Sequence, residues 1–240
     1  MELNCHGESM YKNIKVIGFD ADDTLWVNET FFREAELKFG QLMQGFETIN
    51  QVDQELFKIE IDNLPIYGYG IKGFILSMME AALELSNYQV TPQTMQSIVD
   101  IGKEMLNKPV ELLDGVEEVL NQLSKTHRLI LATKGDLLDQ ERKLEKSGLI
   151  KYFHHIEVMS DKRSCDYQKL LNHLDIEPQQ FLMIGNSLKS DILPLVEIGA
   201  YAIHVPFHTT WQHEQVCPTT IKGKNYQTVN AILEILKFIK

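Results

Sequence analysis

One stretch decides how the chain folds: IKVIGFDADDTL, residues 14–25. Its first half, residues 14–19, is short and rich in β-branched and aromatic side chains, which is typical of a buried strand. Its second half is the polar loop DADDT, residues 20–24, which carries three aspartates. We therefore predict a buried strand that stops at an acidic loop.

After this loop, the spacing of the apolar residues changes twice along the sequence. Residues 28–107 show apolar positions spaced three or four apart, which predicts about four helices and no strand. The last of these helices has Thr91 as its N-cap and Pro92 at its first position. After Pro109, short apolar strands alternate with amphipathic helices, and we expect these strands at residues 128–132, 155–159, 181–184 and 201–205.

This alternation predicts an α/β fold with a doubly wound, Rossmann-like parallel sheet. Right-handed crossovers between parallel strands place helices on both faces of such a sheet. Residues 1–27 and 108–240 would form this core, and residues 28–107 would form a helical domain inserted between the first and second strands. We expect the chain to end in an amphipathic helix over about residues 228–238.

The residues that follow each strand are the candidates for function. Ligands of open α/β sheets bind beyond the carboxyl ends of the strands, so these residues meet at one edge. The set comprises two carboxylates after the first strand, a hydroxyl and a lysine after the second, a lysine after the third, and an amide and a carboxylate after the fourth: Asp20, Asp22, Thr133, Lys134, Lys162, Asn186 and Asp191.

The residue types at this edge favour phosphoryl chemistry. Asp20 and Asp22 lie two apart at a strand end, so both side chains point to the same side. Oxygen donors without His or Cys suit Mg²⁺ rather than zinc. One carboxylate can attack phosphorus while the second moves protons, and Thr133 and Lys162 can donate to the phosphoryl oxygens.

Four motifs, taken in order, resemble those of the haloacid dehalogenase superfamily. The resemblance extends over about residues 12–206, and the helical insert resembles the C1 cap of that family. It implies a strand order of 5-4-1-2-3 in the core. The matching motifs are DADDTL at residues 20–25, Thr133, Lys162, and GNSLKSD at residues 185–191.

The resemblance also implies roles for individual residues. Asp20 would be the nucleophile and Asp22 the general acid and base. Mg²⁺ would be bound by the Asp20 carboxylate, the Asp22 carbonyl oxygen, and a side chain of the fourth motif, for which Asn186 and Asp191 both stay open. Two positions depart from the family pattern, because Asp23 replaces a glycine and Asn186 stands where many relatives have aspartate.

We therefore expect a Mg²⁺-dependent phosphatase that hydrolyses a small phosphorylated metabolite, such as a sugar phosphate or a nucleoside monophosphate. Thr133, Lys134 and Lys162 would bind the phosphoryl group. The alternatives are a phosphotransferase such as a sugar-phosphate mutase, and a phospho-ligand sensor without catalysis. Dehalogenation is disfavoured, because the family's dehalogenases lack an acid two residues after the nucleophile.

Charge and cysteine content limit the remaining function classes. The chain has 23 Lys and Arg against 34 Asp and Glu, a net charge of −11, which disfavours nucleic acids and anionic membranes as partners. Three cysteines without a CxxC motif, and no apolar leader, predict a cytoplasmic protein with reduced thiols. The sequence leaves open the oligomeric state and the roles of His208 and Trp211.

Overall fold

The structure of the protein is a computed structural model that describes residues 11–223 and 226–239. The chain divides into two compact units. The sheet unit comprises the described residues up to Val27, residues 110–133, and those from Leu144 onward. The helical unit comprises residues 28–109 and 134–143, so it includes a segment that we had expected in the core. Cys5 and both ends of the expected core lie outside the described residues.

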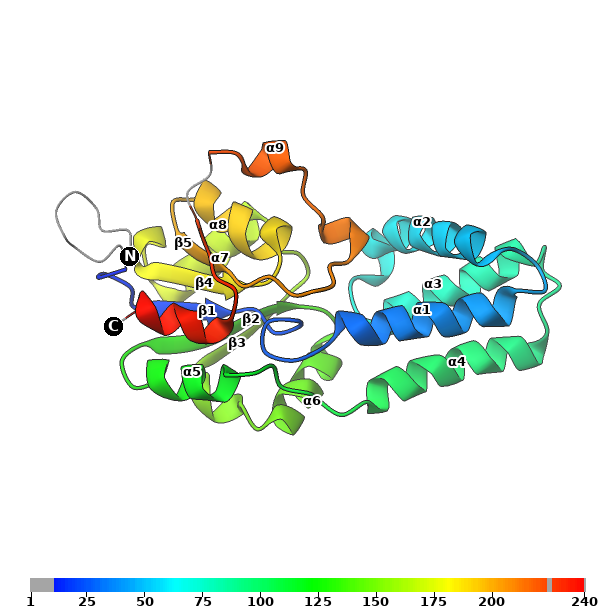
Figure 1. Ribbon diagram of the computed structural model, residues 1–240, viewed down its shortest axis with the longest axis horizontal. Coiled ribbons are helices and arrows are strands. Elements are labelled where there is room, and N and C mark those ends of the chain that lie inside the picture. Colours follow the sequence, from blue (N-terminus) through cyan, green and yellow to red (C-terminus); the bar gives the residue numbers. More distant parts are fainter. Residues whose placement is uncertain (1–10, 224–225, 240) are drawn as a thin grey trace. The chain divides into compact units, whose positions relative to one another are not determined.

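Within the described residues, six strands form one sheet in the order β3-β2-β1-β4-β5-β6 (Figure 1). The strands are β1 (Val16–Phe19), β2 (Arg128–Lys134), β3 (His155–Met159), β4 (Phe181–Gly185), β5 (Tyr201–His204) and β6 (Gln227–Thr228). The central strand β1 runs parallel to both neighbours, because Val16 pairs with Arg128 on one side and with Phe181 on the other. The predicted order 5-4-1-2-3 is confirmed for these five strands, and β6 adds a strand beyond β5 that was not predicted.

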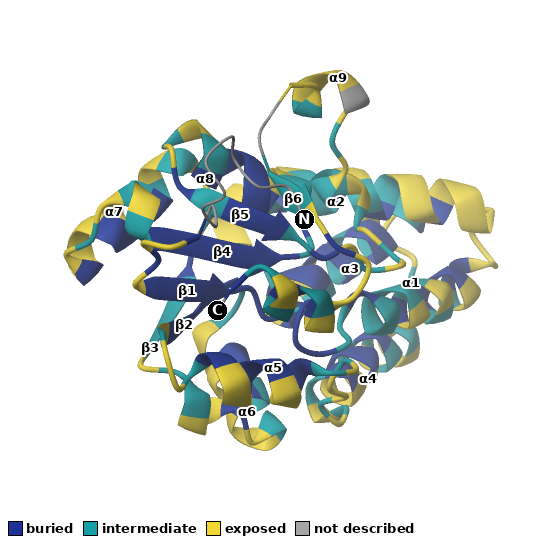
Figure 2. Cartoon of the chain, turned by 60° about the vertical axis from the view of Figure 1, so that its left-hand side comes forward, coloured by how far each residue is buried: buried dark blue, intermediate teal, exposed yellow. Residues whose placement is uncertain are grey.

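Alternate side chains of β1 point to two different hydrophobic clusters, one on each face of the sheet. Ile17 and Phe19 belong to the cluster that contains α5 (Val116–Leu123), and Val16 belongs to the cluster that contains α7 (Ser164–Leu174). Strands β1, β2 and β4 are buried along nearly their whole length (Figure 2). Burial on both faces therefore fixes the strand that carries the acidic loop.

The remaining elements of the sheet unit are short. They are η1 (Ile150–Tyr152), η2 (Pro178–Gln180), the π-helix η3 (Leu188–Ile192), α8 (Leu193–Glu197), η4 (Gln212–Glu214), α9 (Pro218–Ile221) and η5 (Ile232–Lys237). A longer helix, α6 (Leu137–Ser147), begins in the helical unit and ends in the sheet unit. The Asp136 carboxylate caps its first turn by accepting a hydrogen bond from the Asp139 N–H at 3.1 Å.

The prediction of a long C-terminal helix was wrong. Residues 227–228 instead form β6, which pairs with β5, and only residues 232–237 are helical, as the 3₁₀ helix η5. The buried Ile232 and Ile235 are three residues apart, which matches the three residues per turn of a 3₁₀ helix. Sheet pairing at Thr228 therefore replaces the first turn of the expected helix.

Four helices make up most of the helical unit, all of whose residues the structure describes. They are α1 (Glu29–Met43), α2 (Ile49–Tyr67), α3 (Ile71–Leu85) and α4 (Pro92–Asn107). Thr91 caps α4 as predicted, by accepting a hydrogen bond from the Thr94 N–H at 3.1 Å. The apolar faces of the helices meet in one cluster that includes Phe39, Met43 and Met78. In the described part of the chain, no helix has both the length and the apolar character that a membrane span requires.

Candidate active site

The loop after β1 positions Asp20 at the tip of the central strand. Its backbone N–H donates to the carbonyl oxygen of Ile184 on β4 at 2.9 Å, so the sheet pairing continues up to this residue. The loop then turns back, and the Leu25 N–H donates to the Ala21 carbonyl at 2.8 Å. The Thr24 hydroxyl donates to Asp20 Oδ2 at 3.3 Å. Asp20 is therefore buried, and its carboxylate has a defined orientation.

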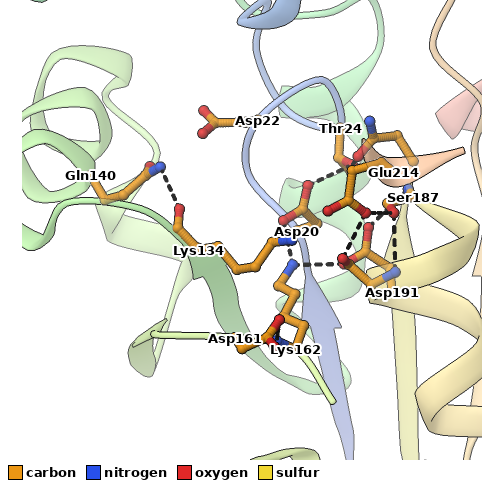
Figure 3. Close-up of polar contacts among 12 residues, drawn as sticks. Asp20, Asp22, Thr24, Lys134, Gln140, Asp161, Lys162, Ser187, Asp191 and Glu214 are labelled. Atoms are coloured by element: carbon orange, nitrogen blue, oxygen red, sulfur yellow. Dashed lines mark hydrogen bonds and ion pairs between the residues drawn. The ribbon is translucent and has the colours of Figure 1, made fainter. Parts of the chain in front are cut away.

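Asp22 and Asp23 have different environments in the same loop. The Asp22 carboxylate accepts a hydrogen bond from Trp26 Nε1 at 2.7 Å, and Figure 3 shows it set apart from the other acidic groups. Asp23 has a φ of 61°, in the left-handed region that glycine adopts most easily. Aspartate is one of the few other residues found there, which explains why it can stand at a position where glycine was expected.

Lys162 connects the ends of three strands. It follows β3, and its Nζ lies 2.5 Å from Asp20 Oδ1 and 2.6 Å from Asp191 Oδ1 (Figure 3). All three side chains are almost inaccessible to solvent, with Lys162 at 3% exposure. The predicted meeting of Asp20, Lys162 and Asp191 is thus present in the structure.

One ammonium group between two buried carboxylates leaves the site with one uncompensated negative charge. Burial, and after it the negative charge of Asp191, raise the pKa of Asp20 to about 7, although the nearby Lys162 opposes the shift. Burial alone would lower the pKa of Lys162, but the charges of Asp191 and Asp20 raise it well above its usual value. The lysine therefore stays protonated, and the site favours an additional cation.

The motif-four turn, which we define as residues 185–191, supplies the other polar groups. Asn186 Oδ1 accepts a hydrogen bond from the Thr24 hydroxyl at 3.2 Å, so this amide lies beside the loop of Asp20. Asp191 Oδ2 accepts a hydrogen bond from the Ser187 N–H at 3.0 Å. Both oxygens of the Asp191 carboxylate are thus engaged, one by Ser187 and one by Lys162.

Gly185 leaves the space that the Asp191 side chain occupies. A Cβ atom at this position would lie 2.3 Å from Asp191 Oδ2 and 2.4 Å from its Cγ. We expect Gly185→Ala to push the Asp191 carboxylate away from Lys162, to cost about 1–3 kcal/mol of stability, and to lower activity. Thermal unfolding and a phosphatase assay measure both effects, and an unchanged melting temperature would contradict the close packing described here.

Thr133 and Lys134 lie at the end of β2 but in different surroundings. Thr133 is 1% exposed, and it lies two residues after Leu131, which pairs with Phe19 directly before Asp20. Lys134 belongs to the helical unit, where its Nζ lies 4.1 Å from the centre of the Tyr69 ring. Its carbonyl oxygen accepts a hydrogen bond from Gln140 at 2.9 Å. Thr133 thus lies at the edge of the sheet where Asp20 lies, and the side chain of Lys134 packs against Tyr69.

The donors at this edge fit a hard divalent cation. Asp20, Asp191 and Asn186 offer only oxygen atoms, and their combined charge exceeds that of Lys162. Among the residues that the structure describes, no group of three or more His, Cys, Asp and Glu side chains is arranged as a metal site. Mg²⁺ does not require such a group, because it is usually held by one or two carboxylates together with water and substrate phosphate.

Sequence reasoning missed one residue at this site, Glu214. Its carboxylate accepts hydrogen bonds from the hydroxyls of Ser187 and Ser190, although it lies 24 or more residues away in the chain (Figure 3). No motif marks Glu214, and only its position after β5 could have suggested it. Of the two residues left open, Trp211 lies beside His213, with ring centres 4.9 Å apart and ring planes tilted by 51°, and His208 is exposed.

Known proteins resemble the chain over most of its length. A family model described as a haloacid dehalogenase-like hydrolase matches residues 14–199. A haloacid dehalogenase-like family hydrolase from Xanthomonas campestris is 40% identical, covers 86% of this chain and 87% of its own, and gives a TM-score of 0.78. N-acylneuraminate-9-phosphatase from Homo sapiens is 22% identical over 92% of each chain. A 2-haloacid dehalogenase from Pseudomonas syringae shares the fold, with 17% identity, 94% and 97% coverage, and a TM-score of 0.61.

Proposed function

Because the chain belongs to the haloacid dehalogenase-like hydrolases, we propose that it is a Mg²⁺-dependent phosphatase that acts through an aspartyl-phosphate on Asp20. The observation that carries this proposal is the buried Asp20 carboxylate, which hydrogen bonds to Lys162 and Thr24 hold in one orientation. The resemblance to a phosphatase over 92% of the chain supports the same reaction class.

Asp20, Asp22 and Asn186 are the residues that would hold Mg²⁺. Asp20 would contribute its carboxylate, Asp22 its carbonyl oxygen, and Asn186 its amide oxygen. Asp191 would be the alternative to Asn186 as the metal ligand from the motif-four turn, and its Oδ1 also holds Lys162 at 2.6 Å. When bound, the metal ion neutralises charge on the phosphoryl oxygens. The chemistry of the donors supports Mg²⁺ over zinc.

The chain's own residues account for both halves of the reaction. The Asp20 carboxylate attacks phosphorus, the bond to the substrate oxygen breaks, and Asp22 protonates the leaving oxygen. Asp22 then removes a proton from water, the water attacks phosphorus, and inorganic phosphate leaves while the Asp20 carboxylate is restored. Lys162 and Thr133 donate to the phosphoryl oxygens in both steps.

Residues 28–107 of the helical unit would act as a C1-type cap for a small substrate in the cytoplasm. Lids of this kind exclude water and select substrates. The name of the human relative, N-acylneuraminate-9-phosphatase, supports a phosphorylated sugar derivative. A nucleoside monophosphate is the other candidate. Lys134 would bind the phosphoryl group together with Thr133 and Lys162.

A panel of phosphorylated metabolites, assayed with Mg²⁺ and with EDTA, tests this proposal. We expect release of inorganic phosphate that EDTA abolishes. Isomerised substrate without free phosphate would indicate a mutase, and tight binding without turnover would indicate a sensor. Halide release from a 2-haloacid would indicate a dehalogenase, which the presence of Asp22 disfavours.

Replacement of Asp22 separates the two steps. We expect Asp22→Asn to lower kcat about 10²- to 10⁴-fold with an alkyl phosphate, because the leaving oxygen needs a proton. With p-nitrophenyl phosphate the leaving group departs as a stable anion, so the first step proceeds and the second stalls. A burst of one nitrophenolate per enzyme followed by slow turnover is the expected trace. Equal losses with both substrates and no burst would contradict the proton transfer assigned to Asp22.

A further inference from the structure

We propose that Glu214 is a positioning residue that fixes the motif-four turn, so that Asn186 and Asp191 are held ready for Mg²⁺ and the phosphoryl group. This inference rests on the proposed function. Glu214 belongs to the loop after β5 and to the short helix η4. In this assignment Glu214 is not a metal ligand, and it acts through the two serines whose hydroxyls donate to it.

Glu214 forms hydrogen bonds at two points of the motif-four turn. Its Oε2 accepts a hydrogen bond from Ser190 Oγ at 2.7 Å and a second one from Ser187 Oγ. The Ser187 Oγ in turn accepts a hydrogen bond from the Ser190 N–H at 3.0 Å. A single carboxylate therefore joins both ends of the first turn of η3.

This network continues to the residues of the site. The Ser187 N–H donates to Asp191 Oδ2 at 3.0 Å, and the Asp191 N–H donates to the Ser187 carbonyl at 2.8 Å. Asp191 holds Lys162, and Asn186 precedes Ser187 in the chain. A shift of Ser187 would therefore move both the amide and the carboxylate that the site requires.

The local backbone explains why the turn needs an outside acceptor. Residues 188–192 form a π-helix, a rare conformation that occurs mostly as single turns and is frequent at functional sites. Ser187 and Ser190 are 7% and 5% exposed, so water cannot readily replace the acceptor of their hydroxyls. A hydrogen bond to a charged carboxylate is shorter and stronger than one to a neutral group.

A second contact between the same two segments offers a matched comparison. Lys189 Nζ lies 2.8 Å from the carbonyl oxygen and 3.0 Å from Nε2 of His213, the neighbour of Glu214. Lys189 is exposed, and its side chain donates to His213 rather than to the acceptor of the two serines. Its removal would loosen the loop after β5 without removing the acceptor of the two serines.

The test is a calorimetric titration of the metal-free protein with MgCl₂, without substrate. We expect Glu214→Ala to weaken Mg²⁺ binding about 10- to 100-fold, as loss of a group that orients metal ligands commonly does. Glu214→Gln should lose less, because one amide oxygen still accepts. Gln215→Ala, at an exposed neighbour, should bind Mg²⁺ like the wild type. The variants' melting temperatures and the hydrogen exchange of residues 185–191 are measured on the same samples.

Wild-type Mg²⁺ affinity and unchanged exchange in Glu214→Ala would overturn the positioning role. An equal loss in Lys189→Ala would also overturn it, since attachment of the loop in general, rather than the Glu214 carboxylate, would then hold the turn. Faster exchange confined to residues 185–191 in Glu214→Ala would support it. Failure of the wild type to hydrolyse any phosphate ester would overturn the proposed function, while the exchange comparison would still decide the role of Glu214.

Discussion

Replacing Asp20 with asparagine should leave a folded protein that hydrolyses phosphate esters at least about 10⁴-fold more slowly than the wild type. The amide keeps the size of the side chain but removes the nucleophilic oxygen anion. Lys162, Thr133 and Asp22 would all stay in place, so the loss would report the nucleophile alone. Activity close to that of the wild type, measured with any good substrate, would end the aspartyl-phosphate mechanism.

Stability provides the control for this variant, because the charged form of the buried Asp20 carboxylate destabilises the folded state. Burial and the charge of Asp191 raise its pKa to about 7, whereas a free aspartate has a pKa of about 3.9. The folded state therefore binds a proton that the unfolded chain releases, and the wild type without metal should lose stability as the pH rises from about 4 to about 7. Asp20→Asn lacks this titration, so its advantage in melting temperature should grow between these values. A variant that melts lower throughout would indicate a damaged fold.

Replacing Lys162 with methionine should have the largest effect on stability. The change leaves two buried carboxylates, Asp20 and Asp191, without their shared cation. Removal of one partner from a buried ion pair costs about 3–5 kcal/mol, and about 2–4 °C of melting temperature corresponds to each kcal/mol in a chain of this size. Activity should fall as well, because the phosphoryl group loses a donor. Thermal unfolding at about pH 8 in EDTA measures the first effect.

Two further variants decide whether charge is the cause. Lys169→Met removes an exposed lysine that pairs with Asp166 at 3.2 Å, and such surface pairs contribute about 0–1 kcal/mol. Asp20→Asn added to Lys162→Met should restore part of the lost stability without restoring activity. A Lys162→Met protein as stable as Lys169→Met, or a double variant that is less stable than Lys162→Met, would contradict the electrostatic account.

Much of the fold was accessible from local patterns. The β-branched run that forms β1 and the helix cap at Thr91 both depend on a few neighbouring residues, so the sequence alone reveals them. The C-terminal segment was misjudged because pairing of residues 227–228 with β5 depends on contacts far away in the chain. A two-residue strand leaves no periodic signal.

In the site, too, some features follow from local sequence and others depend on contacts between distant residues. The carboxyl ends of parallel strands meet at one edge, so the sequence alone is enough to group Asp20, Lys162 and Asp191. The hydrogen bonds from Trp26 to Asp22 and from two serines to Glu214 could not, because they depend on how a loop turns rather than on its composition. Those contacts decide the orientation of the groups that the motifs name.

Trapping of the covalent intermediate tests the central claim most directly. The Asp22→Asn protein would be mixed with Mg²⁺ and p-nitrophenyl phosphate, quenched in acid during turnover, and reduced with borohydride, which converts an acyl phosphate to an alcohol. Peptide mass spectrometry should then find homoserine in place of Asp20, only in the sample that received substrate. Nitrophenolate release with an unmodified Asp20, or modification at another carboxylate such as Asp191, would contradict the account.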